Sequence, residues 1–214
     1  MARSALLVVD MQEYFCQSGH GLARFIESMA GPSALDWYFE WLSGTVVPNI
    51  GRLLGEVRDR RDVVVFTEFG SRRPDGADLP LWARRHNELA VSVIGEPMYL
   101  PLADPASRVI ADLTPSGSDV VLAKSTSGPL AGTDLVGQLR AAEVDRVMVT
   151  GVATDVCVTG MARELADSDF DVLVVEDACG SPIRASHQAA LAVAIPTFAQ
   201  VVGTASLLNV GARR

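Results

Sequence analysis

Short, nearly continuous apolar runs alternate with longer amphipathic segments along the chain of 214 residues. The runs SALLVV at 4–9 and DVVVFT at 62–67 have strand length, and their Val, Leu and Ile content favours parallel strands covered on both faces. Similar runs follow at 119–123, 145–150, 171–175 and 199–202. Between the runs lie helical patterns at about 44–60, 133–143, 155–167 and 184–194.

This alternation predicts a single α/β domain over residues 1–214. We expect three α/β/α layers around a central, mainly parallel, Rossmann-like sheet of about six strands. Two connections, 10–43 and 68–118, are longer than the alternation requires, and long insertions of this kind are usually functional loops or lids. Their large side chains predict a pocket wall, with Phe15, Tyr38 and Trp82 as candidate lining residues.

Composition narrows the partners that the protein could have. A formal net charge of -8 and a pI near 4.8 argue against nucleic acid or an anionic membrane surface as the main partner. The apolar runs are far shorter than the ~18–20 residues of a membrane span, and the amino terminus lacks a signal-peptide layout. We therefore expect a cytoplasmic protein that acts on a small molecule.

Cysteine and histidine spacing argues against a disulfide framework and against a zinc site. Cys16, Cys157 and Cys179 form an odd set without a CxxC motif, which is typical of free thiols. The histidines lie far apart and form no cluster with ligand spacing.

Reactive side chains follow several of the predicted strands. Asp10 comes directly after the first run, Lys124 after the third, and Cys157 seven residues beyond Thr150 at the end of the fourth. Ligands of open α/β sheets bind beyond the carboxyl ends of the strands, so these side chains are expected to face one rim. Asp10 could also cap a loop, and Lys124 could be a solvated strand end. Together, however, they favour an ion pair beside the thiol.

The segment VTGVATDVCVTG at 149–160 gives Cys157 the most specific context. Thr154 or Asp155 is a good helix N-cap, which would place the thiol in the first helical turn. A helix N-terminus lowers a thiol pKa, and its free N–H groups can hold an oxyanion. The alternative, which the local residues leave open, is that Cys157 is a buried core residue. Cys179 lacks such a context, and Ser125, Thr126 and Ser127 could bind substrate or satisfy a turn.

The motifs ALLVVDMQEYF, KSTSGPLAGTDL and VMVTGVATDVCVTGMARELADSDFDVLVVEDACGS, in this order, resemble the isochorismatase-like cysteine hydrolase superfamily. The resemblance spans nearly the whole chain and implies catalytic roles for Asp10, Lys124 and the nucleophile Cys157. It also implies a cis peptide bond between Val152 and Ala153, with the backbone N–H groups of Ala153 and Cys157 as the oxyanion hole.

The resemblance also implies what the site lacks. Metal-dependent nicotinamidases carry D-x-H followed by a second histidine after the second strand, whereas this chain reads FTEFGSRRPDG, with Glu68 at the first position and no histidine before His86. We therefore expect no metal and no cofactor. Isochorismatase itself lacks the cysteine, so vinyl-ether hydrolysis is disfavoured. The expected reaction is cleavage of a C–N bond in a small amide, ureide or carbamoyl compound through a thioester.

Other interpretations remain open at this point. The chain could be a non-catalytic small-molecule-binding or scaffold member of the fold, or a thiol-dependent redox or transferase enzyme, although no resolving cysteine is near Cys157. Arg84 or Arg85 could bind a substrate carboxylate or could be solvated on an amphipathic helix. The resemblance implies a homodimer or homotetramer. The stretch WYFEW at 37–41 is then a candidate interface, unless it forms pocket wall or core.

Overall fold

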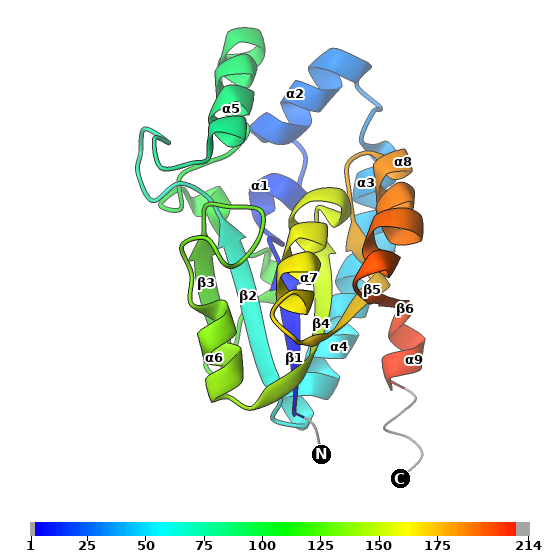
Figure 1. Ribbon diagram of the computed structural model, residues 1–214. Coiled ribbons are helices and arrows are strands. Elements are labelled where there is room, and N and C mark those ends of the chain that lie inside the picture. The colour runs from blue at the N-terminus through cyan, green and yellow to red at the C-terminus, as the bar shows by residue number, and fades with distance from the viewer. Residues whose placement is uncertain (1–2, 209–214) are drawn as a thin grey trace.

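The computed structural model describes residues 3–208 and contains a six-stranded sheet in the order β3-β2-β1-β4-β5-β6 (Figure 1). Every neighbouring pair of strands is parallel. The strands are β1 (Arg3–Val9), β2 (Val63–Phe69), β3 (Val120–Lys124), β4 (Val144–Val152), β5 (Asp171–Gly180) and β6 (Gln200–Val202). The predicted fold class is confirmed, and each strand lies where an apolar run predicts it.

Helices cover both faces of this sheet, as Figure 1 shows. The α-helices are α1 (Glu13–Cys16), α2 (Gly21–Ala30), α3 (Asp36–Trp41), α4 (Val47–Asp59), α5 (Leu81–Ile94), α6 (Leu135–Ala141), α7 (Thr159–Ala166), α8 (Arg184–Ala189) and α9 (Thr204–Leu208). π-helical turns extend three of them, at Leu42–Val46, Thr154–Val158 and Ala190–Ala194. Short 3₁₀ turns lie at Pro105–Ser107, Ala111–Leu113 and Ile195–Thr197.

The central strand β1 shows how the sequence builds two cores. Successive side chains of a strand point to opposite faces. Leu6 and Val8 accordingly pack in a core with α3 and α4, whereas Leu7 and Val9 pack in a second core with α6 and α7. All four side chains are fully buried. A continuous apolar run is therefore what a strand between two helical layers requires.

The strand order reverses direction at β1, because β2 lies on one side of it and β4 on the other. Ligand sites of doubly wound sheets form at such a switch point, beyond the carboxyl ends of the two strands. The long connections 10–43 and 68–118 supply α2 and α5, which lie above that end of the sheet in Figure 1.

Two strands continue further than their apolar runs predict. β2 includes Glu68, and β5 includes Glu176, Asp177 and Cys179, which the sequence pattern places after the strand. The pairing of β4 with β5 shifts register after Val149, so β5 resumes beside β4 beyond the break in the apolar run. Among residues 3–208, no helix is both long enough and apolar enough to cross a membrane.

Candidate active site

Asp10 follows β1 at the switch point and is fully buried. Its backbone adopts the left-handed conformation, with φ of 50°, which aspartate tolerates better than most residues. The Thr67 hydroxyl donates to Asp10 Oδ1 at 2.6 Å, and the Asp10 backbone N–H donates to Thr67. Thr67 of β2 therefore fixes the position of the Asp10 carboxylate.

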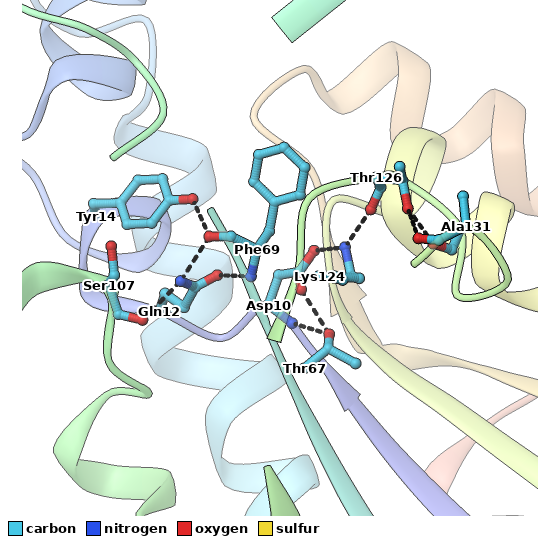
Figure 2. A network of polar contacts seen from close by, with 10 residues as sticks. Asp10, Gln12, Tyr14, Thr67, Phe69, Ser107, Lys124, Thr126 and Ala131 are labelled. Atoms are coloured by element: carbon cyan, nitrogen blue, oxygen red, sulfur yellow. Dashed lines mark hydrogen bonds and ion pairs between the residues drawn. The ribbon is translucent and has the colours of Figure 1, made fainter. Parts of the chain in front are cut away.

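Lys124 is the last residue of β3 and is also fully buried. Its Nζ donates to Asp10 Oδ2 at 2.7 Å and to the Thr126 carbonyl at 3.0 Å, as Figure 2 shows. The ammonium also lies 4.9 Å from the centre of the Phe69 ring. Burial alone would lower the pKa of Lys124, but Asp10 and Cys157 together outweigh it and raise this pKa. The structure thus brings the expected ion pair together.

A second polar cluster, beside the ion pair in Figure 2, joins β2 to the segment after β1. Gln12 donates to the carbonyls of Phe69 and Ser107, at 3.0 and 2.7 Å, and accepts from the Phe69 N–H. Tyr14 donates to the Phe69 carbonyl at 2.8 Å. Gln12 is fully buried, and the sequence analysis missed it because a single glutamine in a loop carries no periodic signal.

Cys157 lies in the π-helical turn Thr154–Val158 that follows β4 and leads into α7. The prediction that Thr154 or Asp155 caps this helix was wrong, because the N-cap position is Ala153 and no side chain caps it. Both candidate side chains are engaged elsewhere. Thr154 Oγ1 lies 2.9 Å from Nδ1 of His187 in α8, and the Ser181 hydroxyl donates to Asp155 at 2.5 Å.

The thiol of Cys157 is not activated in the way that its sequence context suggests. Burial raises its pKa to about 12, opposed by Lys124 and reinforced by Asp10. Asp10 and Lys124 are thus close enough to the thiol to influence its charge. The expectation of a lowered pKa was therefore wrong, since the sequence does not reveal that Cys157 is only 6% exposed. The resting site holds a neutral thiol beside a carboxylate and an ammonium.

The backbone around Cys157 contributes a cis peptide bond and two N–H groups to the site. The peptide bond between Val152 and Ala153 is cis. The N–H groups of Ala153 and Cys157 donate to no group outside their own turn within residues 3–208. They are thus available to an incoming oxygen.

A pocket of about 190 Å³ opens onto the sulfur of Cys157. Phe15, Tyr38 and Trp82 all line it, where the sequence analysis expects them. The other wall residues come from α2, from the ends of β2 and β4, from the turn around Cys157 and from loops, and the sequence pattern does not show that these segments meet. These residues are Leu22, Ile26, Phe69, Tyr99, Val152, Ala153, Asp155, Val156, Ser181, Pro182 and Ile183.

Several other candidates lie outside this pocket. Arg84 lines a separate surface groove and Arg85 lines neither, so neither arginine faces Cys157. The Thr126 hydroxyl donates within its own turn, to Gly128 and Ala131. In the 37–41 stretch, Tyr38 is core and pocket wall, while Trp37 and Trp41 flank His187.

The donor set at Glu68 does not fit a metal. Glu68 accepts from Arg108 at 3.1 Å, and His86 bonds to the Tyr99 hydroxyl. Within residues 3–208, no three His, Cys, Asp or Glu side chains are placed to hold a metal ion. The expectation of a metal-free site stays a prediction.

Because His187 is buried beside the turn that contains Cys157, we expect the protein to lose stability in acid. Burial lowers the pKa of this histidine below its ordinary 6.5, so the unfolded chain binds more protons once the pH falls through that value. Stability is then fully present above pH 6.5 and decreases below it, by up to about 1.4 kcal/mol per pH unit. Urea unfolding between pH 7.5 and 5 should show a shallower loss in His187→Gln than in wild type. His20→Gln is the control, and equal slopes in all three proteins would contradict the assignment.

Comparison with known proteins identifies a family and several similar proteins. The family described as the Isochorismatase domain matches residues 4–206. Among curated proteins, the ureidoacrylate amidohydrolase RutB of Yersinia enterocolitica is 29% identical over 215 residues, covering 97% of this chain and 81% of the relative.

Among solved structures, an isochorismatase family protein from Desulfovibrio vulgaris superposes with a TM-score of 0.78 at 24% identity, covering all of both chains. At that identity the likeness shows the fold. A cysteine hydrolase from Pseudomonas syringae pv. phaseolicola superposes with a TM-score of 0.76 at 25% identity, covering 97% of this chain and 91% of the other.

Proposed function

The chain belongs to the isochorismatase family, and we propose that it cleaves the C–N bond of a small amide or ureide through a thioester on Cys157. Relatives are named amidohydrolases, and the chain is a hydrolase of non-peptide carbon–nitrogen bonds. The observation that carries the thioester proposal is that Cys157 lines a pocket while the buried ion pair of Asp10 and Lys124 acts on its thiol.

Acylation begins from the neutral thiol. A free thiolate is rare when the thiol pKa is about 12, so Asp10 takes the proton as the sulfur attacks the carbonyl carbon. The new C–S bond places negative charge on the carbonyl oxygen. The N–H groups of Ala153 and Cys157 hold that oxygen, and one such donor contributes about 3 kcal/mol in other enzymes. Lys124 holds Asp10 in place for the transfer by pairing with it.

Breakdown of the tetrahedral intermediate reverses the role of Asp10. The protonated carboxyl gives its proton to the nitrogen, the C–N bond breaks, and an amine or ammonia leaves the thioester behind. Asp10 next removes a proton from water, whose oxygen attacks the thioester carbon. The C–S bond then breaks, the acid is released, and the sulfur recovers its proton. Each cycle consumes one amide and one water.

The thioester can be observed directly. Acid quenching of the enzyme during turnover of a panel of amides and ureides should add one acyl mass to the peptide that contains Cys157. Hydroxylamine should divert the same intermediate to a hydroxamate, because it competes with water for the thioester. Mass spectrometry of the digested protein reads both outcomes.

Cys16 and Cys179 are the internal controls in that digest. An acyl group spread over all the cysteines, or turnover with no acyl mass on Cys157 and no hydroxamate, would rule out the mechanism. Binding of amides without any release of ammonia would instead indicate a non-catalytic, small-molecule-binding member of the fold.

A further inference from the structure

The pocket above Cys157 is walled almost entirely by apolar side chains and carries one fixed charge, the Asp155 carboxylate. We propose that Asp155 makes the site selective by charge: the substrate is an amide or ureide with an apolar body and no carboxylate. This inference rests on the proposed function, because it concerns the substrate of the same site.

The shape and lining of the pocket favour a compact apolar group. Its volume of about 190 Å³ is below the range of roughly 300–1,000 Å³ that is usual for drug-sized ligands. Aromatic rings from both insertions surround it, with the rings of Phe69 and Trp82 stacked 6.0 Å apart and Tyr99 edge-on to both. Leu22 and Ile26 of α2 and Ile183 add aliphatic surface. A ligand that matches these walls is itself apolar.

Asp155 supplies the charge. The Ser181 hydroxyl donates to its Oδ1 at 2.5 Å, which holds the carboxylate at the pocket wall. Within residues 3–208 its Oδ2 accepts no hydrogen bond from the protein, so that oxygen is available to a donor on the substrate. A substrate N–H or O–H would bind there, and a substrate carboxylate would be repelled.

No cation offsets this charge among the described residues that line the pocket. Lys124 does not line the pocket and is fully buried in its ion pair with Asp10. The guanidinium of Arg184 lies over the Trp37 ring, 5.5 Å from its centre. His187 is held neutral at pH 7, since burial lowers its pKa. Proteins bind carboxylates with paired Arg or Lys donors, and this pocket presents none.

The contrast with a relative sharpens the inference. The amidohydrolase from Yersinia enterocolitica is named for ureidoacrylate, whose name denotes a carboxylate. A shared family does not transfer the substrate, because the specificity of a site depends on its own walls. In this chain those walls favour the uncharged counterpart of such a molecule.

A matched pair of probes tests the selectivity. Benzamide and 4-carbamoylbenzoate carry the same reacting amide and differ by one carboxylate. For wild type we expect kcat/KM to favour benzamide by about 100-fold, since like charges brought together in a half-buried pocket repel. Asp155→Asn keeps the shape and an oxygen for Ser181 but removes the charge, so the preference should fall about tenfold or more. Asp167→Asn, which removes the same charge from the exposed C-terminal end of α7, should leave the preference unchanged.

The ratio of kcat/KM values separates a specificity role from a structural one. If Asp155→Asn lowers both activities equally, or if wild type hydrolyses 4-carbamoylbenzoate as well as benzamide, the inference is wrong. Ser181→Ala, which retains the carboxylate, is the second variant, and it should keep the preference for benzamide.

A binding measurement makes the test independent of turnover. Calorimetric titration of Cys157→Ala with the same two probes should give a Kd for benzamide that is at least tenfold lower than that for the carboxylate. If neither probe is hydrolysed by wild type but the Kd values differ as expected, the proposed function fails while the selectivity stands. Equal Kd values would overturn the selectivity even in an active enzyme.

Discussion

Alanine at position 157 should lower kcat/KM for amide hydrolysis by about 10⁴-fold or more, because loss of a nucleophile removes the covalent route altogether. Ammonia release under saturating amide is the measurement. The effect should appear in kcat, since the pocket walls that bind the substrate are unchanged.

Two other cysteines provide matched controls. Cys179 is fully buried, and its sulfur lies 3.8 Å from the Val149 carbonyl, so Cys179→Ala should cost stability while leaving the chemistry in place. Cys16→Ser should likewise retain turnover. Ammonia release by Cys157→Ala at the wild-type rate would eliminate the thioester mechanism.

Substitution of Asp10 by asparagine should impair both catalysis and folding. Asp10 is the base in every proton transfer of the proposed cycle, so we expect kcat to fall by about 10³-fold or more. The same change leaves the Lys124 ammonium fully buried without its counter-ion, which typically costs about 3–5 kcal/mol of unfolding free energy. Denaturant unfolding at pH 7 measures the second effect.

A double-mutant cycle measures how much the interaction between Asp10 and Lys124 contributes to the free energy of unfolding. Asp10→Asn combined with Lys124→Met removes both charges, so its unfolding free energy should exceed the value expected from adding the single losses. Asp171→Asn breaks the exposed ion pair with Arg146 and should cost less than about 1 kcal/mol. Additive losses for Asp10 and Lys124 would show that their ion pair contributes no coupling.

The fold could be predicted because burial on both faces of a parallel sheet demands continuous apolar runs, and these runs stand out from the helical patterns. In β1, the alternating side chains of residues 5–9 serve two separate cores, and this requirement makes the stretch directly before Asp10 wholly apolar. The strand ends were less predictable. β5 continues through Glu176 and Asp177, since its pairing with β4 resumes after a register shift that composition does not record.

The candidate active site was likewise predictable from the sequence only in part. The sequence pointed to Asp10 and Lys124 because a charged residue directly after a buried strand is costly to bury unless it is paired. The N-cap and the thiol pKa were predicted wrongly, because Thr154 and Asp155 bond instead to residues of the loop and helix after β5, and burial of the sulfur has no local sequence signal. Tyr99 and Ile183 reach the pocket only through the path of long loops.

The pocket walls and the buried ion pair belong to different elements of the fold, and this separation affects how the protein can evolve. Asp10 and Lys124 lie at the ends of β1 and β3, the two strands that flank β2. Leu22, Ile26 and Trp82 instead belong to helices inserted between the strands. Substitutions in those helices can change the shape of the pocket without disturbing a strand pairing or the buried ion pair. Gene duplicates of such a chain are therefore free to diverge in substrate while they inherit the reaction intact. Laboratory evolution for new amides would do best to diversify the inserted helices first.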